Sequence, residues 1–133
     1  MSTMLPRALG QRVLVVDDDS AVLDTVRAVL RGGYEVEVVA TAVAALKAAD
    51  AHRPDVILLD LNLPGVLTGD AALPLLTRFA PVIVVTGSVD EDLGQRLLDQ
   101  GAFGYLWKPF EISKLRDMVR AAISGHERAD TAS

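Results

Sequence analysis

The chain carries five short apolar runs, rich in β-branched residues, and their spacing restricts the fold more than any other feature. They recur at intervals of roughly 20 to 26 residues, which is the length of a strand plus a helix and too long for a hairpin. Five strands separated by helices are therefore predicted. The runs are Val13–Val16, Tyr34–Val39, Val56–Leu59, Val82–Val85 and Tyr105–Trp107.

Apolar residues between these runs follow helical spacing, and polar or glycine signals mark the ends of the helices. Ser20 is expected to cap the first helix, with Asp19 sharing this role, and Thr41 to cap the second. Pro74, in the third, is compatible with a helix only near the first turn. The expected helices run from Ser20 to a stop at Gly32-Gly33, and over Ala42–His52, Asp70–Phe79, Glu91–Gln100 and Ile112–Ser124.

Strands that are apolar on both faces and alternate with helices are typical of a parallel sheet covered on both sides. The predicted fold class is α/β: a three-layer, doubly wound, flavodoxin-like (βα)5 domain with parallel strands in the order 2-1-3-4-5. Glu35 and Glu37 alternate with apolar residues in the second run, which indicates an edge strand. The domain is expected over residues 12–124, between a leader (1–11) and a charged tail or linker start (125–133).

Composition narrows the class of protein. At 133 residues the chain has room for one domain, and 50% hydrophobic residues support a packed core. A net charge of −5 argues against nucleic-acid binding by this segment, because that affinity comes from Lys and Arg. Cysteine, membrane-length apolar runs and a signal peptide are absent from the sequence, so a soluble cytoplasmic protein is expected. His52 and His126 lack metal-ligand spacing and are expected at the surface.

Polar residues follow four of the five runs. The carboxyl ends of parallel strands lie at one edge of the sheet, and open α/β sheets bind ligands there, where the strand order reverses. The first and third strands flank that point, so Asp17, Asp18 and Asp60 should converge. The polar segments are Asp17-Asp18-Asp19, Asp60, Thr86-Gly87-Ser88 and Lys108-Pro109.

Converging carboxylates need a partner. Two unit charges about 4 Å apart repel by roughly 4 kcal/mol at an effective dielectric near 20, so a proton or a cation must be present. Oxygen ligands without His or Cys suit Mg²⁺. With Lys108 and the hydroxyl of Thr86 to hold an anion, Asp60 could act as nucleophile and form an aspartyl phosphate. Each residue alone reads as a turn, cap or surface group, and only their joint placement indicates a site.

Four segments, VLVVDDDS, DVILLDLNLPG, PVIVVTGS and GAFGYLWKPF, cover residues 12–124 in the order and spacing of a known family. The chain thereby resembles the receiver domain of two-component response regulators. The resemblance implies that Asp60 accepts a phosphoryl group from a phosphohistidine of a sensor histidine kinase or a histidine phosphotransfer protein. It also implies a Mg²⁺ site at Asp60 in which Asp18 binds directly, Asp17 mostly through water, and Asn62 through its backbone carbonyl.

The same resemblance assigns a switch to this site. Thr86 matches a hydroxyl residue that moves toward the phosphoryl group, and Tyr105 matches an aromatic residue whose rotamer follows it. Lys108 matches a phosphate-binding lysine, and its bond to Pro109 is expected to be cis.

The conformational change is expected to reach one surface, made by residues 91–100, 105–107 and 112–124. This surface would act on a downstream effector or a fused output domain, and it would also be the contact of a homodimer. Trp107, with the same strand parity as Tyr105, either enlarges an aromatic patch there or packs under a helix.

Some positions depart from the family pattern. Val66-Leu67-Thr68 place Gly69 one residue later than usual after Pro64-Gly65, which leaves the start of the third helix open. Asn62 and Ser88 occupy positions at which the family tunes hydrolysis of the aspartyl phosphate through access of water.

Three other functions stay open on the sequence alone. A haloacid-dehalogenase-like phosphatase also uses a strand-end Asp and Mg²⁺, but it needs a second acid where Asn62 stands, and its nucleophile normally follows the first strand. A flavodoxin-like cofactor domain shares the strand order, but its first loop cradles phosphate with Gly, Ser or Thr instead of three acids. The third is a receiver-like interaction module that takes no phosphate.

Overall fold

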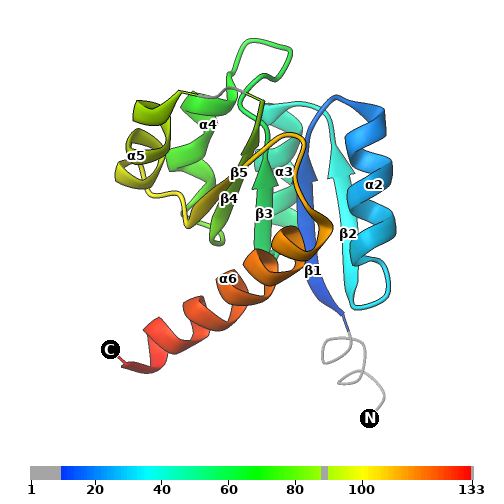
Figure 1. The fold of residues 1–133 in the computed structure, drawn as a ribbon, viewed down its shortest axis with the longest axis vertical. Coiled ribbons are helices and arrows are strands. Elements are labelled where there is room, and N and C mark those ends of the chain that lie inside the picture. Colours follow the sequence, from blue (N-terminus) through cyan, green and yellow to red (C-terminus); the bar gives the residue numbers. More distant parts are fainter. Residues whose placement is uncertain (1–9, 88–89, 133) are drawn as a thin grey trace.

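The computed structural model describes residues 10–87 and 90–132 of the chain. Within them, five parallel strands form one sheet in the predicted order, β2-β1-β3-β4-β5 (Figure 1). β1 begins at residue 11, so the last residue of the expected leader belongs to the sheet, and residues 1–9 lie outside the described part. The strands are β1 (Gln11–Val16), β2 (Tyr34–Val39), β3 (Val56–Leu59), β4 (Val82–Thr86) and β5 (Gly104–Trp107).

Helices cover both faces of the sheet, which confirms the three layers (Figure 1). Leu14 and Ile57 face α3, α4 and α5, whereas their neighbours Val15 and Leu58 face α2 and α6. The central strands are apolar throughout because both of their faces are buried. No helix in the described part of the chain is both long and apolar enough for a membrane span. The helices are α2 (Ser20–Leu30), α3 (Ala42–His52), α4 (Gly69–Leu76), α5 (Glu91–Asp99) and α6 (Ile112–Ala132).

The cap of α2 is Asp19, and Ser20 is the first helical residue, so the prediction for Ser20 was wrong. Asp19 has an extended backbone (φ −87°, ψ 109°), and its side chain accepts a hydrogen bond from the backbone N–H of Ala21 at 3.0 Å. An N-cap needs this extended conformation to reach the free N–H groups of the first turn. Thr41 caps α3 as predicted, through the backbone N–H of Ala44.

α4 begins at Gly69 and ends at Leu76, short of the predicted end at Phe79. Its N-cap is Thr68. Pro74 lies in the second turn of this helix, where the missing N–H removes a helical hydrogen bond. A turn at residues 77–79 follows the helix.

α6 continues to Ala132, beyond the predicted end at Ser124. The prediction ended this helix where its apolar stripe ends, at Ile123. The residues that follow include Glu, Arg and Ala, which favour helix, and no proline, so the helix can continue past the apolar stripe. Figure 1 shows the helix extending past the sheet.

β2 lies at an edge of the sheet, as the alternation of Glu35 and Glu37 predicted. Both carboxylates have basic partners: the Nε of Arg12 lies 3.3 Å from Oε1 of Glu35, and the Nδ1 of His52 lies 2.8 Å from Oε1 of Glu37. The side chain of His52 is 57% exposed, which confirms its surface position. The side chain of His126 lies outside the described residues.

The register of the sheet brings the ends of β1 and β3 to the same level. Val16 of β1 pairs with Leu59 of β3, and the backbone N–H of Asp60 donates to the carbonyl oxygen of Val16 at 2.9 Å. Asp17 and Asp60 therefore leave two adjacent strands side by side at the carboxyl edge.

Gly69 lets the first turn of α4 lie against the loop that carries Asp60. Its backbone N–H donates to the carbonyl oxygen of Leu61 at 3.2 Å. A Cβ at position 69 would lie 2.5 Å from both the carbonyl oxygen of Asp60 and the Cα of Leu61. These are backbone atoms, which cannot swing aside as the end of a side chain can.

We expect Gly69→Ala to lower the free energy of unfolding by about 2 kcal/mol, because the added methyl group forces the loop away from α4. Chemical denaturation measures this. Gly32→Ala is the matched control, since nothing lies within 4 Å of a Cβ there, and it should leave stability nearly unchanged. Equal stabilities of the two variants would contradict the close approach of Gly69 to the loop.

Candidate functional site

Three carboxylates gather at the carboxyl edge of the sheet, as predicted. Asp17 is 2% and Asp60 5% exposed, whereas Asp18 is exposed. Each of the three can offer an oxygen within 4.8 Å of the others'. These three side chains are close enough together that they could hold one cation, and the predicted convergence of Asp17, Asp18 and Asp60 is thus present in the structure.

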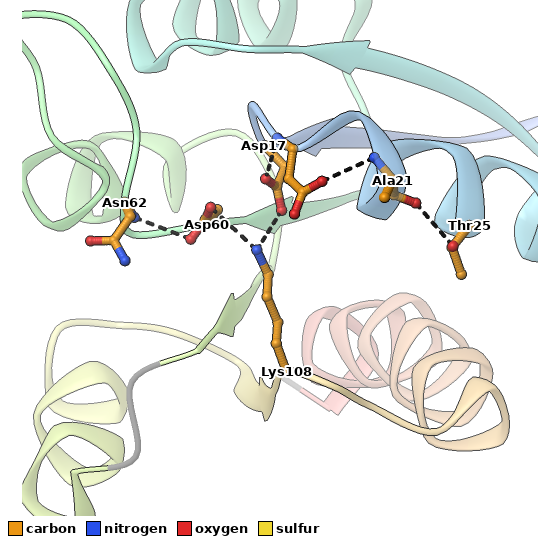
Figure 2. A network of polar contacts seen from close by, with 7 residues as sticks. Asp17, Ala21, Thr25, Asp60, Asn62 and Lys108 are labelled. Carbon is orange, nitrogen blue, oxygen red and sulfur yellow. Dashed lines mark hydrogen bonds and ion pairs between the residues drawn. The ribbon is translucent and has the colours of Figure 1, made fainter.

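Lys108 reaches into this group from the end of β5 (Figure 2). Its Nζ lies 2.9 Å from Oδ2 of Asp17 and 3.3 Å from Oδ2 of Asp60, so one ammonium group bridges the two buried acids. Its backbone N–H donates to the carbonyl oxygen of Thr86 at 2.8 Å, which fixes the start of the loop after β5. The predicted cis bond between Lys108 and Pro109 is present.

The other oxygen of each buried acid is held by the backbone. Oδ1 of Asp17 accepts the N–H of Asp19 at 2.9 Å, and Oδ1 of Asp60 accepts the N–H of Asn62 at 3.1 Å (Figure 2). Each bond joins a side chain to the N–H two residues later, a local turn that Asp readily forms. From the sequence, Asp19 was expected only to share the cap of α2. The available signal for the contact with the backbone N–H of residue 19 was Asp17 itself, because an aspartate readily accepts from the N–H two residues later.

Burial and neighbouring charges change both pKa values at the site. Burial raises the pKa of Asp60 above its ordinary value, and the charge of Asp17 adds to this, against the opposing effects of the Asn62 N–H and of Lys108. Burial lowers the pKa of Lys108, but the hydrogen bond to Asp17 and the charges of both acids outweigh it, so this pKa is raised. Lys108 therefore carries its proton at neutral pH.

The remaining predicted residues lie around this cluster. Thr86 ends β4 and is fully buried. Tyr105 and Trp107 lie on the same face of β5, with ring centroids 5.1 Å apart and an angle of 56° between the rings. The side chain of Asn62 is exposed at the rim. Ser88 lies outside the described residues.

The donor set fits Mg²⁺. All three acids offer oxygen atoms, which hard cations prefer, and no histidine belongs to the cluster among the described residues. Two buried carboxylates this near each other would repel, so a divalent cation beside Lys108 would stabilise the arrangement. Asp17, Asp18 and Asp60 are the side chains that would hold it.

The family model for the response regulator receiver domain matches residues 13–120. Among curated relatives, the DNA-binding response regulator MtrA of Mycobacterium tuberculosis is 39% identical over 124 residues, covering 86% of this chain and 51% of MtrA. The transcriptional regulatory protein PdtaR of the same organism is 34% identical over 120 residues, covering 88% of this chain and 58% of PdtaR. The chain thus spans about half the length of these relatives.

Solved structures agree with these sequence matches. The signal receiver domain of a LuxO repressor protein from Vibrio parahaemolyticus superposes with a TM-score of 0.85 at 26% identity, covering 94% of this chain and 98% of that one. The receiver domain of the Pseudomonas aeruginosa sensor histidine kinase PA1611, described with magnesium in its active-site cleft, gives a TM-score of 0.76 at 32% identity, covering 86% and 98%. The fold, the acidic cluster and these matches together show that the chain belongs to the receiver domains of two-component response regulators.

Proposed function

We propose that Asp60 is the phosphoacceptor of a phosphorylation-dependent switch, and that a protein phosphohistidine is the donor. The observation that carries this proposal is the position of Lys108 Nζ, which lies between Asp17 and Asp60 at the edge of the sheet. A cation placed beside a buried carboxylate suits a reaction that brings a phosphoryl group to that carboxylate, because the ammonium group can bind the phosphoryl oxygens.

The proposed transfer needs no other nucleophile. A carboxylate oxygen of Asp60 attacks the phosphorus atom, the bond from phosphorus to the imidazole nitrogen of the donor breaks, and its electron pair returns to that nitrogen. Mg²⁺, when bound, spreads the negative charge of the transferring group. Asp18, Asp60 and the backbone carbonyl of Asn62 would hold the cation directly, and Asp17 mostly through water. Lys108 exchanges its bond to Asp60 for one to the phosphoryl group.

The signal would then pass from the site to one surface. The new phosphoryl oxygens would attract the hydroxyl of Thr86, and Tyr105 would move into the space that Thr86 leaves. Thr86 lies at the end of β4 and Tyr105 in the adjacent β5, on the same face of the sheet, which supports this order of events. The surface of α5, β5 and α6 changes as a result, and we propose it as the output surface and as the contact of a homodimer.

The proposed partners follow from this chemistry. A sensor histidine kinase or a histidine phosphotransfer protein would supply the phosphoryl group. The recipient of the signal would be a separate effector or an output domain fused to this one, as the name of the DNA-binding relative MtrA suggests. The segment described here is acidic and would not itself contact nucleic acid.

We propose a switch in preference to a phosphatase that acts on other substrates. A phosphatase of the haloacid-dehalogenase type needs a carboxylic acid two residues after its nucleophile, to protonate the leaving group. Asn62 stands at that position, and its side chain is exposed. An amide cannot donate a proton in this way, so any catalysis would concern the domain's own phosphorylation and dephosphorylation.

Incubation with acetyl phosphate and Mg²⁺ should add about one phosphoryl group to the wild type and none to Asp60→Asn, because the amide is not a nucleophile. Intact-mass spectrometry measures the gain. Asp50→Asn, which removes an exposed acid from α3, is the control and should be labelled like the wild type. Equal labelling of wild type and Asp60→Asn would mean that another residue is the acceptor.

A second prediction concerns stability without metal. Because folding raises the pKa of Asp60, its charged form destabilises the fold at pH values above the folded pKa, and this penalty is relieved as the pH falls through it. In EDTA at about pH 7, Asp60→Asn should therefore melt a few degrees above the wild type, a shift that about 1 kcal/mol produces. The difference should shrink toward about pH 4.

Mg²⁺ should raise the melting temperature of the wild type more than that of Asp60→Asn, since the variant has lost one charged ligand. Differential scanning fluorimetry with and without Mg²⁺ measures both effects, with Asp50→Asn expected to follow the wild type. If Mg²⁺ raised the melting temperature equally in all three proteins, the cation would bind at a site that does not include Asp60.

A further inference from the structure

Gly94 lies inside α5, where glycine is unfavourable. A glycine in a helix interior lowers stability by roughly 1 kcal/mol relative to alanine, because the unfolded chain gains freedom. Position 94 is the fourth residue of a nine-residue helix, so neither end of the helix requires it. Glycine in such a place often marks a close approach by another group.

The group that approaches is the ring of Tyr105. A Cβ at position 94 would lie 2.5 Å from both Cζ and the hydroxyl oxygen of Tyr105, and 2.9 Å from its Cε2. Carbon atoms in contact are normally about 3.5 to 4.0 Å apart. The outer end of the tyrosine ring therefore rests directly on the backbone of α5, in space that any side chain at position 94 would fill.

Trp107 contacts the same ring from β5, with the ring centroids 5.1 Å apart. Tyr105 is thus held by the bare backbone of Gly94 and by the indole of Trp107. With the ring in this position, the oxygens of Asp60 accept hydrogen bonds from Lys108 and from the N–H of Asn62.

We propose that Gly94 is a positioning residue: because it has no side chain, the Tyr105 ring can pack against the backbone of α5 at this point, a contact that we call the seat. The seat holds the ring in this position and so favours the unphosphorylated state. This inference rests on the proposed function, in which Tyr105 moves when Asp60 is phosphorylated. In that movement toward Thr86, the ring leaves its contact with Gly94. A side chain at position 94 would block the seat and shift the population of Tyr105 toward the phosphorylated arrangement.

Thermodynamic linkage gives the direction of the effect. If blocking the seat favours the phosphorylated arrangement, then a ligand that prefers this arrangement binds more tightly to the blocked variant. Beryllofluoride with Mg²⁺ is a suitable probe, because it mimics a phosphoryl group on a carboxylate without a covalent step. We expect Gly94→Ala to bind it roughly tenfold more tightly than the wild type.

The seat itself is tested by melting temperatures in two backgrounds. Gly125→Ala is the matched control: Gly125 also lies in a helix, and a Cβ there would make an ordinary contact with Phe103 at 3.5 Å. This control should raise the melting temperature by a few degrees, as a better helix former does. Gly94→Ala should give no such rise in the wild type, but should give it in a Tyr105→Ala background, where the ring is absent.

Trp107 supplies a second readout, since it is the sole tryptophan of the chain. In Mg²⁺ alone, the emission spectrum of Gly94→Ala should be shifted toward that of the wild type saturated with beryllofluoride. Gly125→Ala should keep the wild-type spectrum and the wild-type affinity for beryllofluoride.

The possible results distinguish the contact between Tyr105 and Gly94 from the proposed phosphorylation of Asp60. If Gly94→Ala stabilises the protein equally in both backgrounds, the seat does not exist. If the melting temperatures show the seat but Gly94→Ala binds beryllofluoride no more tightly than wild type, the seat has no regulatory role. If the wild type itself binds no beryllofluoride, the proposed function fails, and its regulation by Gly94 fails with it, while the melting temperatures still decide whether the seat exists.

Discussion

The ammonium group of Lys108 between two buried carboxylates is the interaction that ties the site to the rest of the structure. Asp17 and Asp60 leave adjacent strands and would repel each other there, while Lys108 comes from the far edge of the sheet, 91 residues after Asp17 and 48 after Asp60. A charged group so distant in sequence arrives only if every strand and helix between them is placed correctly. The geometry of the site therefore depends on the whole fold.

The sequence was sufficient to predict the architecture and most of the acidic site. The apolar runs at βα spacing gave all five strands within two residues of their observed ends, because central strands such as Val56–Leu59 are buried on both faces and leave a continuous apolar signal. The convergence of Asp17, Asp18, Asp60 and Lys108 then followed from topology, since every parallel strand ends at the same edge. Neither step required knowledge of side-chain packing.

What could not be predicted depends on backbone angles and close contacts. Whether Asp19 or Ser20 caps α2 is decided by which of them is extended, and both residue types suit the position. The end of α6 lies in a segment without an apolar stripe, so periodicity has no signal there. Gly94 was inconspicuous in the sequence because the residue that requires a glycine there, Tyr105, lies eleven residues away. Only the packing of α5 on β5 brings the two together.

The charged edge of β2 has a consequence for how the domain behaves at high concentration. An open parallel sheet presents unpaired backbone groups along its outermost strand, which is where a foreign chain can add as a further strand and begin aggregation. Here Glu35 and Glu37 stand on that strand, engaged by Arg12 and His52. An approaching chain would have to disturb these polar contacts and their water before it could form a ladder with β2, and this barrier opposes strand addition at that edge.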